Sequence, residues 1–140
     1  MEENILEIVE KSCRIYRDVI AVKYLSHREI VEKSYGDMWD DIRKTAVILR
    51  NNGLCGTHIA LVGSSSYEWI CAYMAILFTG NTAVPLDANL SVSELHELLN
   101  RSGSIALFCG ASRKDVITEL TDDCPEMNIV FTMEKKVDIE

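Results

Sequence analysis

The chain has 140 residues, of which 48% are apolar and 26% charged, with seven glycines and two prolines. This composition fits one globular domain and excludes collagen, low-complexity disorder and a coiled coil. Fourteen basic and 22 acidic residues give a net charge of −8, so the protein repels phosphate backbones and we expect no nucleic-acid partner.

The first third of the chain predicts a helix, a hairpin and a second helix. Apolar residues at helical spacing over residues 4–16 indicate a short amphipathic helix. Two β-rich runs, residues 19–25 and 29–33, flank a polar turn at Ser26-His27-Arg28 and predict a hairpin. Ser34 followed by Asp37 is a capping-box pattern that begins a helix over residues 35–52.

The remaining two-thirds alternate apolar runs with helices. The runs cover residues 59–62, 82–85, 104–109 and 128–132. The intervening helices are predicted to begin with capping boxes at Ser65 and Glu68, at Ser91 and Glu94, and at Ser112 and Asp115, the last over residues 113–120. The first of these helices ends at Gly80 and is apolar on all sides, so we expect it to be buried.

The apolar runs recur every 23 to 24 residues, a spacing that suits βαβ crossovers. They are continuous rather than alternating, as expected for strands covered on both faces. The sequence therefore predicts an α/β fold: a mostly parallel sheet of βαβ units flanked by helices, with an N-terminal helix and β-hairpin. No linker divides the chain, so residues 1–140 are expected to form a single domain.

Several features indicate a cytoplasmic protein without a membrane span or metal site. The longest apolar run, Trp69 to Phe78, has ten residues, whereas a bilayer span needs about 20. The acidic start, Met1-Glu2-Glu3-Asn4, does not match a signal peptide. The five cysteines form no C-x-x-C pair and indicate scattered buried thiols in a reducing compartment. The three histidines lie near no cluster with metal-ligand spacing.

Catalytic motifs are missing: the chain has no G-x-G-x-x-G after a strand, no G-x-x-x-x-G-K-[ST] and no G-x-S-x-G. The candidate ligand loops are Ser64, Ser65 and Ser66, where a strand meets a helix, and Asp87 at the end of another strand. Amides and hydroxyls at a helix N-terminus bind anions, and parallel sheets bind ligands at the carboxyl ends of strands. The alternative is structural: a serine caps the helix and the aspartate turns the backbone, which is the interpretation we favour.

A series of segments, in order and spacing, resembles the N-terminal region of the adenylate-forming enzymes. This family comprises acyl-CoA synthetases, adenylation domains of peptide synthetases and luciferases. The resemblance covers about residues 18–110, and the tryptophans and the Val-Pro-Leu-Asp ending are most similar to the acyl-CoA (long-chain fatty-acid) ligase branch. The segments are Ser34-Tyr35-Gly36-Asp37-Met38-Trp39, Ala46-x-x-Leu49-x-x-x-Gly53-x-x-Gly56, Ile59-Ala60-Leu61-Val62, Glu68-Trp69, Ala72-x-x-Ala75-Ile76-Leu77-x-x-Gly80 and Ala83-Val84-Pro85-Leu86-Asp87.

The resemblance implies a parent enzyme that activates a carboxylate with Mg-ATP to an acyl-adenylate and pyrophosphate, then transfers the acyl group to coenzyme A. In the family, the phosphate loop ending in Lys, the nucleoside-binding aromatic and Asp, and the catalytic Lys all lie downstream of the matched region. We therefore expect no catalytic residue, cofactor or metal in this chain. ATP, Mg²⁺ and coenzyme A belong to the parent.

Residues 1–140 are thus expected to be the N-terminal fragment of a larger ligase, inactive alone, whose partner is the remainder of the ligase chain. An apolar interface left uncovered favours self-association. Two alternatives stay open: a self-contained doubly wound α/β ligand-binding module that uses the loops near Ser64 and Asp87, and the N-terminal part of a peptide-synthetase-type adenylation domain.

Overall fold

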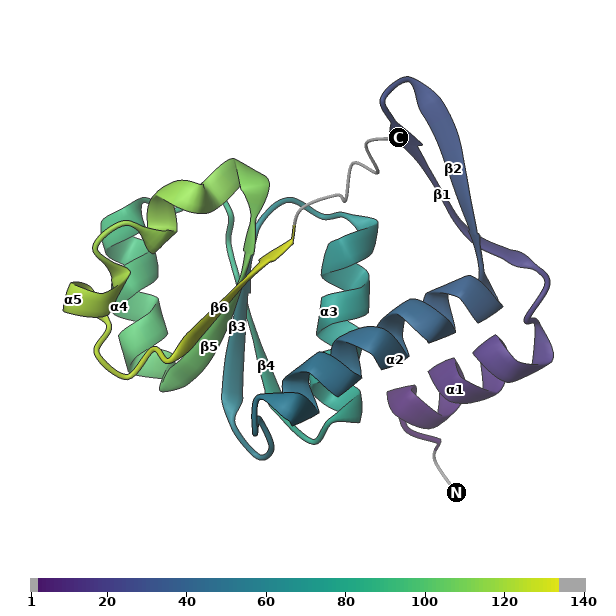
Figure 1. Ribbon diagram of the computed structural model, residues 1–140, viewed down its shortest axis with the longest axis horizontal. Coiled ribbons are helices and arrows are strands. Elements are labelled where there is room, and N and C mark those ends of the chain that lie inside the picture. Colours follow the sequence, from purple (N-terminus) through teal and green to yellow (C-terminus); the bar gives the residue numbers. More distant parts are fainter. Residues whose placement is uncertain (1–2, 134–140) are drawn as a thin grey trace.

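The computed structural model describes residues 3–133, and Figure 1 shows a parallel sheet with its helices at one end and a helix with a hairpin at the other. The predicted N-terminal helix, hairpin and second helix are confirmed. Met1 and Glu2, which contributed to the expectation about targeting, lie outside the described residues. The first elements are α1 (Ile5–Ile15), β1 (Ile20–Ser26), β2 (Glu29–Ser34) and α2 (Tyr35–Asn51).

The hairpin of β1 and β2 is antiparallel and turns through His27 and Arg28, whose φ angles of 49° and 69° are both positive. Two central residues with positive φ are typical of the type I′ turn, whose twist matches that of the flanking strands. Leu25 lies opposite Ile30 beside the turn, and both are about 70% exposed (69% and 70%). The hairpin protrudes from the rest of the molecule (Figure 1), and these two exposed apolar side chains lie near its outer end.

All four predicted strands of the second part are confirmed to within two residues. The helix predicted over residues 113–120 is wrong, because residues 111–117 form a 3₁₀ helix with non-helical angles at Arg113 (φ −127°, ψ 32°). The elements are β3 (His58–Val62), α3 (Tyr67–Phe78), β4 (Thr82–Leu86), α4 (Val92–Ser102), β5 (Ser104–Gly110), the 3₁₀ helix η1 (Ala111–Ile117), α5 (Leu120–Asp123) and β6 (Ile129–Met133).

The four strands form one parallel sheet in the order β4-β3-β5-β6. The chain runs from β3 outward to β4 on one side, then crosses back to β5 on the other side. The strand order therefore reverses between β3 and β5. In open parallel sheets, ligands bind at the carboxyl ends of the strands near such a reversal.

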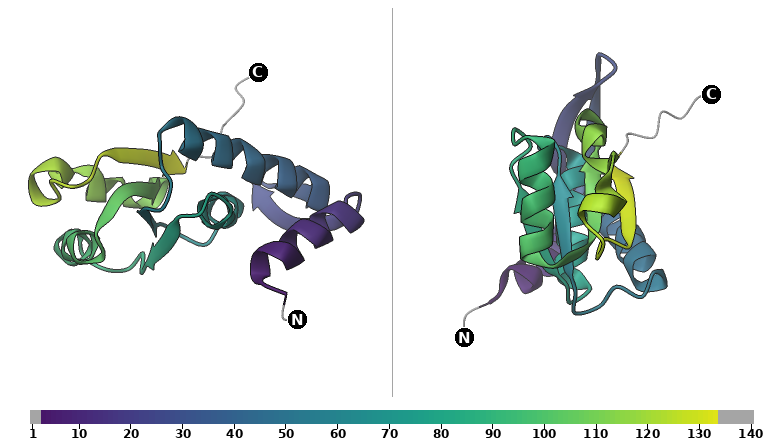
Figure 2. Two further views of the ribbon diagram at one scale, coloured as in Figure 1. Left: turned by 90° about the horizontal axis from the view of Figure 1, so that it is seen from below. Right: turned by 90° about the vertical axis from the view of Figure 1, so that its left-hand side faces the viewer.

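The sheet separates two buried layers, because successive residues of a strand point to opposite faces. From β3, Ile59 and Leu61 join the core under α2 and α3, whereas Ala60 and Val62 join the core under α4 and η1. All four are 0% exposed. Figure 2 shows α4 and α2 on opposite sides of the strands. The predicted α/β fold, with helices covering both sheet faces, is confirmed.

The helix starts confirm two of the predicted capping boxes, at Ser34 with Asp37 and at Ser91 with Glu94. The prediction for Ser65 and Glu68 is wrong by one residue: Ser66 caps α3 by accepting a hydrogen bond from the Trp69 amide, without a capping box. Ser65 and Ser66 are adjacent and have the same side chain, so the sequence pattern does not distinguish them. In the structure Ser66 is the N-cap of α3.

The capping box predicted at Ser112 and Asp115 is also wrong, since η1 begins without a side-chain cap. Asp115 instead accepts hydrogen bonds from Arg113, at 3.0 and 3.2 Å. Asp115 is therefore paired with Arg113 and does not complete a capping box with Ser112. Of the predicted buried thiols, Cys55 is the exception, because it is exposed while the other four are buried.

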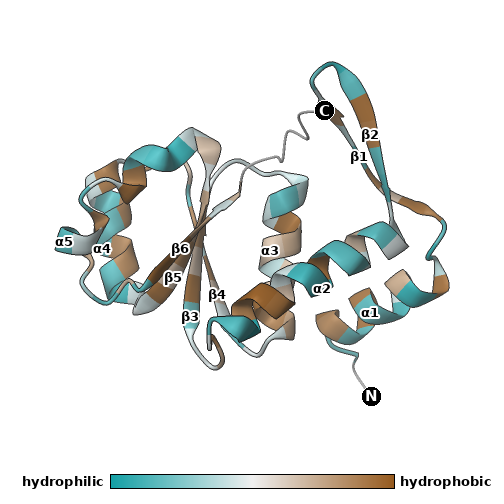
Figure 3. Cartoon of the chain, in the orientation of Figure 1, coloured by the Kyte–Doolittle hydropathy of each residue, from teal (hydrophilic) through white to brown (hydrophobic). Residues whose placement is uncertain are grey.

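Hydropathy differs between the parallel sheet and the N-terminal helix and hairpin. Figure 3 shows hydrophobic colour along β5 and β6, and mixed colours along the hairpin and α1. Helix α3 buries Cys71, Ala75 and Ile76, as its apolar sequence predicted, although Ile70 stays 38% exposed. Over residues 3–133 no helix is long and apolar enough to cross a bilayer.

Candidate functional site

Three of the four predicted ligand-loop residues meet in one pocket at the carboxyl ends of β3 and β4. Ser64 and Ser65 follow β3, and Asp87 follows β4. We call this the strand-end pocket; its volume is about 410 Å³ and its lining is Gly63, Ser64, Ser65, Trp69, Leu86, Asp87, Ala88 and Asn89. The sequence therefore located residues that the fold brings together, although they are more than 20 positions apart.

Ser66 and Asp87 each also have a local structural role. The Ser66 hydroxyl accepts from the Trp69 amide at 3.1 Å, which caps α3. The Asp87 carboxylate accepts from the Asn89 amide at 2.8 Å, which turns the chain after β4. Both contacts are of the kind that the structural interpretation predicted for a serine cap and a loop aspartate.

Arg113 fixes the loop that carries Asp87, a function that sequence reasoning missed. Its Nη1 donates to the carbonyl oxygens of Ala88 and Leu90, both at 2.6 Å, while Asp115 holds the other side of the guanidinium. The Asp115 contact raises the pKa of Arg113 above its usual value and lowers that of Asp115. No local pattern signals this contact, because the arginine and its acceptors are 23 and 25 residues apart.

Beside this pocket, Gly63 and Gly110 end β3 and β5 in close contact. A Cβ atom added to Gly110 would lie 3.0 Å from the Gly63 Cα, closer than a side chain tolerates without a backbone shift. The parallel register of β3 and β5 places these two glycines side by side. A side chain at either position would therefore crowd the backbone of the neighbouring strand end.

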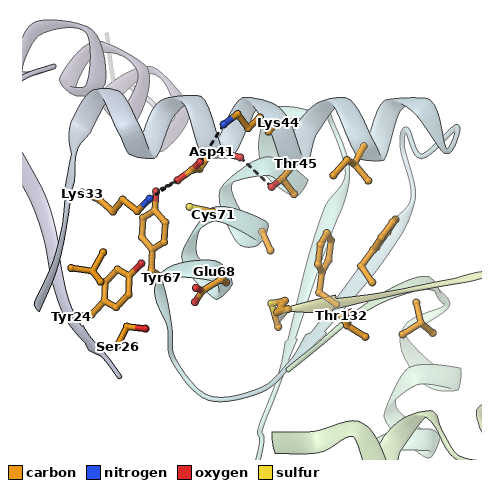
Figure 4. Close-up of a pocket in the computed structure, with 17 residues that line it drawn as sticks. Tyr24, Ser26, Lys33, Asp41, Lys44, Thr45, Tyr67, Glu68, Cys71 and Thr132 are labelled. Atoms are coloured by element: carbon orange, nitrogen blue, oxygen red, sulfur yellow. Dashed lines mark hydrogen bonds and ion pairs between the residues drawn. The ribbon is translucent and has the colours of Figure 1, made fainter. Parts of the chain in front are cut away.

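A second and larger cavity, which the sequence did not predict, separates the hairpin from the parallel sheet. We call it the inter-sheet groove (Figure 4); its volume is about 1040 Å³. Helices α2 and α3 form its base, one face of the hairpin forms one wall, and β6 forms the other. Its lining includes Tyr24, Ser26, Val31, Lys33, Asp41, Lys44, Thr45, Ile48, Tyr67, Glu68, Cys71, Ala72, Phe108, Val130, Phe131, Thr132 and Met133.

The hairpin end of the groove is organised around Asp41 of α2. Its carboxylate accepts a 2.5 Å hydrogen bond from the Tyr67 hydroxyl, and the Lys33 and Lys44 ammonium groups lie 3.7 and 3.9 Å away. The Tyr24 ring stacks on Tyr67 with 5.6 Å between centroids. These contacts, visible in Figure 4, tie the hairpin to α2 and α3.

Burial governs the acidity of the two proton donors in this region. Burial, reinforced by the hydrogen bond to Asp41, raises the pKa of the Tyr67 phenol far above its ordinary value. Burial likewise raises the pKa of the Cys71 thiol to about 11. Both groups stay protonated at neutral pH, so Tyr67 acts as a hydrogen-bond donor and Cys71 as an apolar packing group.

Two aromatic pairs and His58 have packing and hydrogen-bonding roles. Trp39 packs edge-on against Phe78, and Trp69 stacks on Tyr73. His58 Nδ1 lies 2.7 Å from the Ser102 carbonyl oxygen. Between Glu3 and Met133, no group of three or more His, Cys, Asp or Glu side chains is arranged to hold a metal ion.

Together, the parallel strands, the reversal of their order and the helices on both faces define a doubly wound α/β fold, and the strand-end pocket lies at the carboxyl ends of β3 and β4. The sequence profile of the AMP-binding enzymes matches residues 9–138. The chain belongs to the AMP-binding enzyme family, as the resemblance of its motifs implied.

Curated relatives include both synthetases and acyl-CoA ligases. A hybrid PKS-NRPS synthetase of Emericella nidulans is 32% identical over 90 residues, which are 64% of this chain and 2% of the relative. An acyl-CoA ligase of Penicillium expansum is 25% identical over 105 residues, 74% of this chain and 21% of the relative. The chain thus spans about a fifth or less of the length of these relatives.

Solved structures of ligases share the fold. The N-terminal domain of FACL13 from Mycobacterium tuberculosis superposes with a TM-score of 0.83 at 23% identity, covering 94% of this chain and 33% of that one. The R395G form of coronafacic acid ligase from Pectobacterium brasiliense gives 0.85 at 24% identity, covering 99% and 27%. The fold of this chain therefore corresponds to one part of these larger proteins.

Proposed function

We propose that this chain is the N-terminal structural part of an ATP-dependent acid–thiol ligase that converts a carboxylate and ATP to an acyl-adenylate and pyrophosphate. The observation that carries the proposal is the family match over residues 9–138 on a chain that corresponds to about a third or less of each matched protein. The acyl group is then transferred to coenzyme A.

In this proposal the 140 residues are not catalytic by themselves. The sequence has no glycine-rich loop followed by Lys-Ser or Lys-Thr, the pattern that cradles phosphates in many nucleotide-binding proteins. ATP is bound and Mg²⁺ is held by residues of the parent chain outside this part. The chain's own contribution is a rigid sheet whose ligand edge carries Ser64, Ser65 and Asp87, and these side chains form part of the acyl-pocket wall.

The rigidity of that edge supports a positioning role. The Asp87 loop is held at two carbonyl oxygens by Arg113, and α3 begins at the capped Ser66. A wall of this kind orients a bound acyl group through shape, without moving a proton or forming a bond.

Two measurements test the proposal. Titration calorimetry of the 140-residue protein with Mg-ATP and with carboxylic acids is expected to give no heat of nucleotide binding. The full chain encoded by the native reading frame is expected to exchange pyrophosphate into ATP in a carboxylate-dependent manner. Tight ATP binding by the 140 residues alone would instead favour a self-contained binding module, and a full chain without carboxylate-dependent exchange would refute the ligase.

The second candidate is a peptide-synthetase-type adenylation domain, favoured by the synthetase relatives. Besides the Emericella protein, cyclosporin synthetase of Tolypocladium inflatum is 30% identical over 112 residues. The two candidates share the adenylation step and differ in the thiol that receives the acyl group. Product analysis of the full chain, supplied with either coenzyme A or a phosphopantetheinylated carrier protein, distinguishes them.

A further inference from the structure

His96 of α4 is a buried ionisable side chain that lines neither of the two cavities described above. It is 3% exposed, and both of its ring nitrogens lie within hydrogen-bond distance of an acceptor. Nδ1 lies 2.7 Å from the Asp123 carboxylate of α5, and Nε2 lies 2.7 Å from the Val116 carbonyl oxygen of η1. The ring therefore joins α4, η1 and α5, which lie at the end of the molecule away from the hairpin (Figure 1).

Both partners of the ring accept hydrogen bonds and have no proton to donate. An ionised carboxylate and a carbonyl oxygen each need a donor, whereas a neutral imidazole has one N–H and one bare nitrogen. The doubly protonated imidazolium, with an N–H on each nitrogen, satisfies both partners at once. Its positive charge also lies against the Asp123 carboxylate, so this hydrogen bond is of the stronger, charge-assisted kind.

A neutral ring gives up the contact with Val116. If its single proton were on Nε2, the bare Nδ1 would face the Asp123 carboxylate at 2.7 Å and the two would repel each other. The proton therefore stays on Nδ1, and the Val116 carbonyl oxygen then faces the lone pair of Nε2. Val116 is 0% exposed, so bulk water does not reach this oxygen to replace the lost donor. A buried carbonyl group without a partner destabilises the arrangement that contains it.

Local helix signals do not hold the segment that the ring contacts. α5 has only four residues and begins at Glu119, whose left-handed backbone (φ 59°) is unfavourable for a residue with a Cβ atom. η1 begins without a side-chain cap. A second contact from α4 comes from Asn100, whose Nδ2 donates to the Asp123 carbonyl oxygen at 2.7 Å. The hydrogen bonds from α4 therefore contribute directly to keeping η1 and α5 in place.

The same segment holds the loop of the strand-end pocket. Arg113 of η1 donates to the carbonyl oxygens of Ala88 and Leu90, in the loop that follows β4. This loop begins with Asp87, which lines the pocket. One short element, η1, thus binds the His96 ring through one residue and the pocket loop through another. A hydrogen-bonded chain of this kind can transmit a change at the ring to the loop.

The elements packed against α4 carry other ionisable groups, and the two nearest thiols do not change their charge near neutral pH. Cys124, directly after α5, donates to the His96 carbonyl oxygen at 3.4 Å, and burial raises the pKa of its thiol. Cys109 of β5 donates to the Arg113 carbonyl oxygen, and burial raises its pKa as well. Histidine is the side chain that ordinarily changes its charge between about pH 5 and 8. The charged neighbours are Arg113, Lys114 and Asp115 on η1 and Asp122 and Asp123 on α5.

We propose that His96 is a proton-dependent clamp: its doubly protonated ring holds η1 and α5 against α4, and loss of one ring proton frees η1 and loosens the Asp87 loop of the strand-end pocket. The sign follows from the donors. The clamp is complete at lower pH, where the ring carries two protons, and incomplete at higher pH, where it carries one. The clamp is independent of the proposed ligase reaction, because all of its contacts lie within the described residues of this chain.

Two measurements on the 140-residue protein test the clamp between about pH 5 and 8. The ¹⁵N chemical shifts of the His96 ring are expected to show two protonated nitrogens at the low end of this range and a single Nδ1–H at the high end. Over the same change, amide exchange corrected for the intrinsic effect of pH is expected to become about 10-fold faster at Thr118, at the end of η1, and at Asn89, in the pocket loop. The Ile59 amide in β3 is the control and keeps its protection.

Three outcomes contradict the clamp. A ring that carries one proton over the whole range overturns the proposal. A ring that loses a proton without any change in exchange at Thr118 also overturns it. A change at Thr118 without one at Asn89 overturns the link between the clamp and the pocket loop.

Matched variants separate this contact from a general charge effect. Asp122 and Asp123 are exposed neighbours on α5, and the Asp123 carboxylate is the one that contacts the ring. In Asp123→Asn, the loss of the ring proton is expected about one pH unit lower, because the carboxylate that favours the charged ring is gone. Asp122→Asn is expected to leave this pH nearly unchanged, and equal shifts in the two variants refute the clamp. His96→Gln is expected to abolish the pH dependence at Thr118 and Asn89; its persistence in the folded variant would assign the effect to another group.

Discussion

The parallel sheet and the N-terminal arm, which comprises α1 and the hairpin, differ in how they bury apolar residues. Strand β3 buries every residue after His58, whereas neither hairpin strand contains a buried residue and α1 buries only Cys13. The arm nevertheless contains exposed Leu25 and Ile30. The sheet thus contains its own core, while the arm presents apolar surface of the kind that marks an interaction site.

This difference predicts that the stability of the 140-residue protein resides in the sheet. The Asp41 cluster and α2 hold the arm against the sheet, but few of the arm's side chains leave water. The arm should therefore open at a lower free energy than the sheet. Five predictions test this comparison, from the largest expected effect to the smallest.

The largest difference is expected between Leu61→Ala and Ile30→Ala. Leu61 is 0% exposed in a central strand, so its truncation leaves a cavity and lowers the free energy of unfolding by about 2–5 kcal/mol. Ile30 is 70% exposed, and its truncation is expected to change that free energy by about 0.5 kcal/mol or less. Urea denaturation followed by circular dichroism measures both, and similar losses would mean that the arm belongs to the same core.

A smaller loss is expected from Asn81→Ala, which removes a buried hydrogen-bonding centre of the sheet. The Asn81 side chain accepts from the Thr57 amide and hydroxyl and donates to Leu54 and Thr79. Leaving these partners unsatisfied is expected to cost about 1–3 kcal/mol. Asn52→Ala, which removes one exposed bond to the Ile48 carbonyl oxygen, is the control and should cost about 0.5 kcal/mol.

The capping boxes give an effect of about 1 kcal/mol each. Ser91→Ala in the sheet and Ser34→Ala at the junction with the arm are both expected to lower the free energy of unfolding by this amount. The hydrogen bonds from Ser91 hold the pKa of Glu94 below its ordinary value, and those from Ser34 do the same for Asp37. If one variant destabilises and the other does not, the two helix starts are not equivalent.

The sign of the pH dependence follows from those lowered pKa values. Each carboxylate contributes stability above its unfolded pKa, near 4.5 for Glu94 and 3.8 for Asp37, and this contribution is lost as pH falls through the lower folded value. NMR titration of the carboxyl groups checks this, and Ser91→Ala should move the Glu94 pKa upward while leaving that of Asp37 in place.

The smallest effect concerns local opening, read from thiol labelling under native conditions. Cys55 is exposed and should react first with iodoacetamide, so Cys55→Ser removes the fast phase. Among the buried thiols, Cys13 in the arm is expected to react about 10-fold faster than Cys109 in β5, because the arm opens more readily. Mass spectrometry of digested samples assigns each site. Equal rates at Cys13 and Cys109 would indicate one cooperative unit.

The sequence predicted the start of a helix correctly where two residues close in the chain form the capping box. Ser34 with Asp37, and Ser91 with Glu94, lie three residues apart and complete their hydrogen bonds within one turn. The same pattern failed at Ser112 because Asp115 is held by Arg113, whose position depends on the loop after β4. A local rule fails when a distant partner competes for the same side chain.

The two cavities also differ in whether local sequence patterns could predict them. Ser64, Ser65 and Asp87 could be selected from the sequence because each follows an apolar run, and the carboxyl ends of parallel strands share an edge. The inter-sheet groove could not be selected, since Asp41, Tyr67 and Phe131 come from three elements whose packing no short pattern specifies.

By itself, the sequence determined that this protein is an α/β domain of the adenylate-forming type, because strand spacing, helix caps and motif order are properties of neighbouring residues. Only the tertiary structure decided the strand order, the contact between Gly63 and Gly110, and the meeting of hairpin, α2 and β6 residues around the inter-sheet groove. The reason is physical: pairing and packing join residues tens of positions apart, and their free energies depend on how the whole chain folds.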